Sequence, residues 1–126
     1  MYSLTKTDLL TLIAKGEDSA VEFKRDDLRP EQLAKELVAF GNFEGGKVLL
    51  GVEDDGTVSG LHYTEGRDAL RVEEWIMTVC RNHVQPGVIP FFQLVRDVEP
   101  GRDVAVIQLN RAVQVLHVWH NQRRTY

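Results

Sequence analysis

The chain has 126 residues, 43% of them hydrophobic and 27% charged, so the sequence predicts one globular domain and excludes wholesale disorder. A formal net charge of −4 argues against a protein that is basic over its whole surface, so any nucleic-acid contact must be a local patch. No apolar run approaches the ~20 residues that cross a bilayer. The first residues have no signal-peptide pattern, and Cys80 is the single cysteine. We therefore expect a cytoplasmic protein with no membrane partner.

The first part of the chain predicts a helix, a strand and a second helix. Residues 4–15 place apolar side chains on one helical face, and Gly16 is placed to end that helix. Residues 20–24 alternate in polarity, which is typical of a half-buried strand. Pro30 and Glu31 then open a helix, because proline fits the first turn and an acid suits the positive end of the helix dipole.

A buried strand and an acidic turn follow the second helix. Residues 47–52 form an apolar run, as expected for a central strand that is covered on both faces. Residues 53–56, Glu-Asp-Asp-Gly, predict a tight turn. Residues 57–61 are then expected to return as the partner strand of a hairpin.

The remaining sequence predicts one more helix and further strands. Apolar residues at helical spacing indicate a helix over 65–83, which the Gln-Pro-Gly sequence at 85–87 ends. Residues 91–98 and 104–109 are expected to form an antiparallel pair, and residues 115–119 another strand. The predicted fold class is α+β, with a mixed, mainly antiparallel sheet and about three packed helices.

The densest group of motifs resembles a known family. V-E-F-K at 21–24, A-F-G-N at 39–42, G-G-x-x-x-x-G-V at 45–52 and E-D-D-G at 53–56 look, in this order, like the Schlafen AlbA-type domain. That domain, also called a divergent AAA or ATP-binding domain, occurs in bacterial transcriptional regulators and in RecG-related, helicase-like proteins. The resemblance implies an α/β domain that binds nucleic acid, with DNA favoured over RNA.

The end of the sequence resembles the start of the family's last strand. Residues 120–126 fit its x-x-R-x-Y pattern, but the usual continuation, with an arginine and a Gly-Ser pair, is missing. We therefore expect residues 1–126 to be a single domain that is truncated at its C-terminus, with further domains in the full-length protein. A protein-interaction domain or a homo-oligomer is a further alternative, because a missing strand would leave a sheet edge unpaired.

The favoured function is binding of nucleic acid by cations, without a required cofactor. Lysine and arginine side chains neutralise backbone phosphates, and the strongest pair lies in a predicted turn near the C-terminus. The candidate contacts are Lys24, Arg25, Lys47, Arg123 and Arg124.

Acidic residues suggest a metal-dependent nuclease as the first alternative. The resemblance implies three acids, as in endoribonuclease relatives: Glu17 and Glu22 have the family's spacing of five residues, and Glu53 takes the third position with Asp54 beside it. The family usually has aspartate at the third position. If these carboxylates converged, Glu17, Glu22 and Glu53 could hold Mg²⁺ or Mn²⁺ to activate water. Otherwise Glu22 and Lys24 are an ordinary ion pair on a strand.

A nucleotide-binding module is the second alternative. Asn42, Gly45 and Gly46 form a loop that could surround the phosphates of ATP, although the Lys-Ser/Thr ending of a P-loop is absent. The other interpretation of this loop is a helix cap with closely packed glycines.

Overall fold

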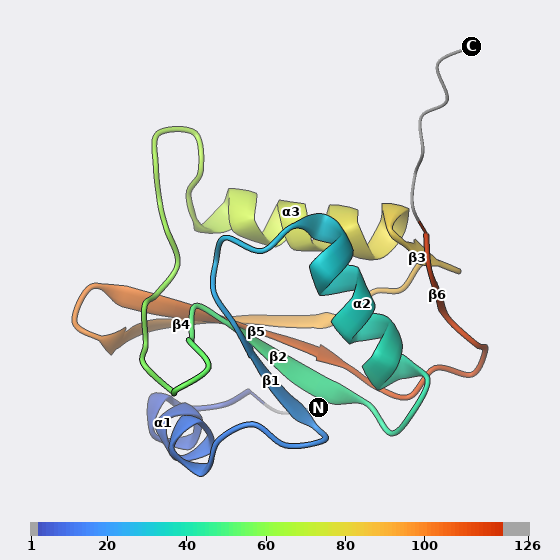
Figure 1. Ribbon diagram of the computed structural model, residues 1–126. Coiled ribbons are helices and arrows are strands. Elements are labelled where there is room, and N and C mark those ends of the chain that lie inside the picture. Colours follow the sequence, from blue (N-terminus) through green and yellow to red (C-terminus); the bar gives the residue numbers. More distant parts are fainter. Residues whose placement is uncertain (1–2, 120–126) are drawn as a thin grey trace.

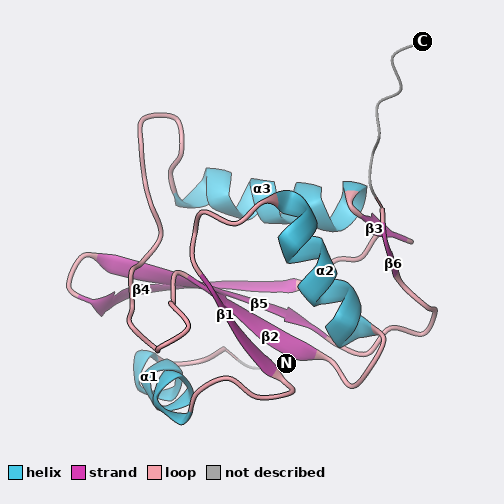
Figure 2. Ribbon diagram, viewed as in Figure 1, coloured by secondary structure: helices cyan, strands magenta, loops and turns pink. Residues whose placement is uncertain are grey.

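A mixed sheet forms the centre of the molecule (Figures 1 and 2). The computed structural model describes residues 3–119. The strands β1 (Val21–Lys24), β2 (Gly46–Leu50), β5 (Arg102–Leu109) and β4 (Phe91–Glu99) lie in the order β1-β2-β5-β4. β1 and β2 run parallel, whereas the other two pairs are antiparallel. The predicted α+β class with a mixed, mainly antiparallel sheet is confirmed.

Helices cover both faces of the sheet. α1 (Lys6–Lys15) packs against one face, and α2 (Pro30–Gly41) and α3 (Ala69–Asn82) pack against the other (Figure 1). The helix count of about three is confirmed within the described residues. None of these helices is long and apolar enough to span a membrane.

Side-chain alternation along β2 divides the hydrophobic core into two clusters. Leu49 points to the α1 side, whereas Val48 and Leu50 point to α2 and α3. All three side chains are fully buried, as expected for a central strand. Lys47, in the same strand, is half-buried on the α1 side, so the run is not apolar throughout.

The predicted hairpin after β2 is present, but residues 57–61 form a single antiparallel bridge in place of a strand. Only Val58 forms a bridge, to Val52. Gly56 and Gly60 have φ values of 89° and 82°, which turn the backbone away from a regular ladder. The amides of Glu53 and Ser59 pair across the turn with the carbonyls of Thr57 and Gly51, so the hairpin is short. The amide of Leu61 then donates to the carbonyl of Asp103, where the chain crosses to β5.

The third helix begins later than predicted, at Ala69 instead of residue 65. Residues 64–67 close a turn, with the amide of Thr64 donating to the carbonyl of Arg67. The side chain of Asp68 then caps the helix by accepting a hydrogen bond from an amide in its first turn.

A two-stranded sheet lies at the end of the described chain. β3 (Val84–Gln85), which the sequence analysis did not predict, pairs with β6 (His117–Val118). The strand predicted over residues 115–119 is therefore present but shorter. The antiparallel pair of β4 and β5 is confirmed and begins and ends within three residues of the predicted bounds.

A buried ion pair anchors the loop between β2 and α3. The Asp26 side chain is fully buried, and the Arg67 guanidinium binds it through two hydrogen bonds of 2.7 and 2.8 Å. The amide of His62 donates to the same carboxylate at 2.6 Å. Residues 62–67, which form the tall loop in Figure 1, are thus held to the segment that follows β1.

Replacing Arg67 by alanine should therefore destabilise the fold. The Asp26 carboxylate would stay buried without its cation, which costs about 3 kcal/mol in unfolding free energy. Arg71→Ala is the matched control, because Arg71 pairs with Glu74 at an exposed position and its loss should cost less than about 0.5 kcal/mol. Urea denaturation measures the unfolding free energy of both variants. Equal losses of stability in the two variants would contradict this role of the buried ion pair.

Candidate functional site

The strand that carries Glu22 lies beside the acidic turn. β1 pairs in parallel with β2, and the carbonyl of Lys24 accepts hydrogen bonds from the amides of Gly51 and Val52 at 2.7 and 3.2 Å. Residues 53–56 follow directly, so the acidic turn leaves the sheet at the C-terminal end of β1. The two predicted acidic segments are neighbours in space.

Alternation along β1 determines what surrounds its polar side chains. Val21 and Phe23 are buried in the α1 cluster, so Glu22 and Lys24 point to the opposite face, beside α2. There the Lys24 Nζ lies 3.0 Å from the Glu36 Oε2. Lys24 thus forms its ion pair with a helix residue.

Glu36 is the residue of this cluster that the sequence analysis missed. It directly precedes the buried Leu37, at the border of the apolar stripe of α2. The signal available in the sequence is an acidic residue at the border of an apolar helical stripe. Spacing alone could not show that this border lies against Lys24.

Glu17 reaches β1 from the turn after α1. Its Oε2 accepts a hydrogen bond of 2.9 Å from the amide of Phe23, and its carboxyl group also hydrogen-bonds to that of Glu22. The family spacing of five residues therefore brings these two carboxyl groups into contact. Asp54, in the exposed acidic turn, adds its negative charge near Lys24.

The crowding of carboxyl groups changes their protonation. Burial, the hydrogen bond with Glu17 and the charges of Glu36 and Glu17 raise the pKa of Glu22 from 4.5 to about 7, against the lowering effect of Lys24. Partial burial lowers the pKa of Lys24, but Glu36, Glu22 and Asp54 outweigh it and raise that pKa above its ordinary value. Glu22 is therefore partly protonated near neutral pH.

The acidic cluster does not form the predicted three-ligand metal site in this arrangement. Across residues 3–119, no three Asp, Glu, His or Cys side chains lie close enough together to hold a metal ion. The backbone of Glu53 closes the turn by pairing with Thr57 and Gly56. The metal ligands Glu17, Glu22 and Glu53 stay a prediction.

Within residues 3–119, the predicted phosphate contacts Lys24, Arg25 and Lys47 do not form one surface. Lys24 is paired with Glu36, and Arg25 lies 3.4 Å from an exposed carboxylate of Asp27. Lys47 lies on the α1 side of the sheet, opposite Lys24, with Gln108 as its cross-strand partner. The remaining predicted contacts lie outside the described residues; these are Arg123 and Arg124.

The predicted nucleotide loop is bonded to its own chain. The Asn42 side chain donates to the carbonyl of Leu116 at 2.9 Å and accepts from its amide at 2.7 Å. A side chain at Gly46 would collide with the ring of Phe40. The ATP-phosphate role of Asn42, Gly45 and Gly46 stays a prediction.

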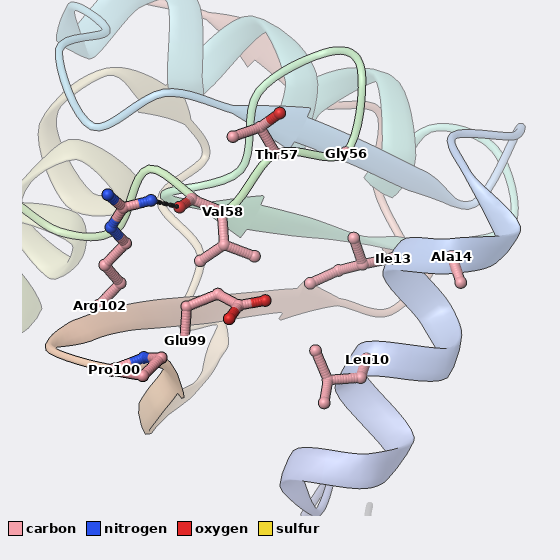
Figure 3. A pocket seen from close by; sticks show the side chains of 9 residues that line it. All are labelled: Leu10, Ile13, Ala14, Gly56, Thr57, Val58, Glu99, Pro100 and Arg102. Atoms are coloured by element: carbon pink, nitrogen blue, oxygen red, sulfur yellow. Dashed lines mark hydrogen bonds between the residues drawn. The ribbon is translucent and has the colours of Figure 1, made fainter.

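A hollow of about 580 Å³ lies on the α1 side of the sheet (Figure 3). Leu10 and Ile13 form its apolar wall, and Glu99 and Arg102 face them from the β4–β5 hairpin. Arg102 donates a hydrogen bond of 3.0 Å to the carbonyl of Val58 (Figure 3). None of the predicted site residues lines this hollow.

The raised pKa of Glu22 predicts how stability depends on pH. Because the pKa of Glu22 is raised on folding, its contribution to stability is present below pH 4.5 and is lost as the pH rises toward about 7. Glu22→Gln should remove this decline, so the variant gains stability relative to the parent as the pH rises. Denaturation at several pH values tests this, and a carboxyl NMR titration of Glu22 should have its midpoint near pH 7. A midpoint near the ordinary 4.5 would contradict the raised pKa of Glu22.

The sequence and the fold have known counterparts. Residues 17–126 match the family model described as Schlafen, AlbA_2. A solution NMR structure of the N-terminal domain of an ATP-dependent DNA helicase RecG-related protein from Nitrosomonas europaea is similar, with 25% identity and a TM-score of 0.66. The match covers 87% of this chain and 75% of that one.

A second similar structure supports the fold alone. The DIP2311 protein from Corynebacterium diphtheriae is 18% identical with a TM-score of 0.54, and the match covers 89% of this chain but 23% of that chain. No curated protein matches the sequence. Since the family model spans residues 17–126, from the first glutamate of the acidic cluster onward, the chain belongs to the Schlafen AlbA_2 family.

Proposed function

We propose that this chain is a nucleic-acid-binding domain of a helicase-related or transcription-regulating protein, with DNA as its favoured ligand. The observation that carries the proposal is the similarity to the N-terminal domain of the RecG-related protein over 87% of this chain. Family membership over residues 17–126 supports it independently of that structure.

The electrostatics of the described residues favour phosphate contacts away from the acidic cluster. The charge of Lys24 is neutralised by Glu36, and Glu17 and Asp54 add negative charge beside it. Without an added metal cation, a phosphodiester approaching this edge of the sheet would be repelled.

The opposite end of β2 is better suited to phosphates. Lys47 is half-buried there on the α1 face, and within the described chain no acidic side chain forms an ion pair with it. Arg111 lies close by, because its amide and Asn110 pack against Gly45, two residues before Lys47. These two cations are the proposed backbone contacts, together with the predicted Arg123 and Arg124.

Binding through phosphates should depend steeply on salt. Lys47→Ala should weaken binding to single-stranded and duplex DNA of any sequence and lower the salt slope by about 1. Lys35→Ala is the control, because Lys35 is an exposed lysine on α2. Fluorescence anisotropy between about 50 and 200 mM salt measures the DNA affinity of both variants. The proposal would be refuted if the affinity did not change with salt concentration or on substitution of Lys47 and the two C-terminal arginines.

A metal-dependent nuclease is the second candidate function, favoured by the contact between the Glu17 and Glu22 carboxyl groups. A carboxylate whose pKa is about 7 can accept a proton from an attacking water near neutral pH, which is the task of a general base. No step through a metal ion is assigned, because the described acids do not form a three-ligand set.

Cleavage assays separate this candidate from simple binding. If the pair is catalytic, the protein should cleave RNA or single-stranded DNA when Mg²⁺ or Mn²⁺ is added, and Glu22→Gln should abolish cleavage. Glu65→Gln, an exposed acid in the loop before α3, should cleave as well as the parent. Cleavage that survives Glu22→Gln would come from another protein in the sample.

A further inference from the structure

A second hollow lies at the end of the sheet where β5 finishes and β4 begins. It has a volume of about 310 Å³, and its walls combine an aromatic ring, aliphatic side chains and amides. Phe91 and Gln108 are cross-strand partners among its lining residues, and most of the others come from residues 86–89 and from the segment after β5, without Arg111 and Val115. We call it the Phe91 hollow. Its amide side chains are those of Gln108, Asn110 and Gln114.

The Phe91 hollow differs in charge from four other hollows of the described surface. None of its lining residues is acidic. In a chain with 19 acidic and 15 basic residues, a hollow without carboxylates repels a polyanion less than one that contains them. Each of the other four contains at least one carboxylate; examples are Glu99, Glu73, Asp68 and Asp26.

Exposed apolar side chains line the hollow, and two cationic residues adjoin its lining residues in the sheet register and in the sequence. Ile89 and Val113 line it and are 90% and 103% exposed, so neither packs in the core. Lys47 is the cross-strand partner of Gln108, on the same face of the sheet. Arg111 lies between two lining residues in the sequence.

We infer that the Phe91 hollow binds an unstacked base of single-stranded nucleic acid, while Lys47 and Arg111 contact the phosphates on either side of it. This inference rests on the proposed function and assigns that function a site. An aromatic ring and aliphatic walls suit the face of a base, and side-chain amides supply both donors and acceptors for its edge. A base in a duplex is paired and stacked, so it cannot enter such a hollow.

Paired substitutions at two exposed valines provide the test. Val113→Glu places a carboxylate at the mouth of the hollow without disturbing the core. Val115→Glu adds the same charge two residues away, at a side chain that is 68% exposed and does not line the hollow. Gln108→Ala removes an amide from the wall as a second variant. The probes are labelled single strands of about 12 nucleotides, one with bases and one abasic along its whole length.

The expected result is that the parent protein binds the strand with bases about tenfold more tightly than the abasic strand. Val113→Glu and Gln108→Ala should reduce that difference, and Val115→Glu should retain it. Equal affinity for both strands, or equal effects of the two glutamate variants, would overturn the inference and leave the proposed function standing. Failure of the parent protein to bind either strand or duplex DNA would instead refute the proposed function.

Discussion

The parallel pairing of β1 with β2 is the constraint on which the candidate site depends. Its register sends Phe23 into the α1 cluster and, by alternation, turns Glu22 and Lys24 toward α2. The same pairing brings the acidic turn to the end of β1, because the carbonyl of Lys24 bonds to the chain just before that turn. A shift of one residue in the register of β1 against β2 would bury Glu22 in an apolar cluster. The same register therefore determines both the charged edge and the packing of the core.

The fold could be predicted where periodicity and local turn chemistry agree. The capped first helix, the proline-led second helix and the β4–β5 hairpin follow from such local signals. The strand at residues 57–61 is shorter than predicted, because the turn chemistry of Asp55 and Gly56 favours a hairpin but does not determine how far its second arm stays paired. That arm leaves β2 for a distant contact, the hydrogen bond from Leu61 to Asp103, which no local pattern encodes.

The site was predicted in part, for a similar reason. Glu17 and Glu22 were selected by the family's spacing of five residues, and the structure brings their carboxyl groups together because both lie within one short stretch of chain. Glu36 was missed because its approach to Lys24 depends on how α2 crosses the sheet. Lys24 and Lys47 were grouped by charge, yet the strand register places them on opposite faces of the sheet. The sequence shows which residues are charged. The face of the sheet on which each charged side chain lies depends on how the strands pair.

The bond between Glu17 and the amide of Phe23 also bears on how copies of this protein avoid aggregation. β1 is the last strand on its side of the sheet, and an exposed strand edge is a template for another chain to add to. Here a carboxylate already accepts an outward-facing amide of that edge. An incoming strand would have to displace Glu17 and approach the neighbouring acids, so the residues that form the candidate site also protect the sheet from edge-to-edge polymerisation.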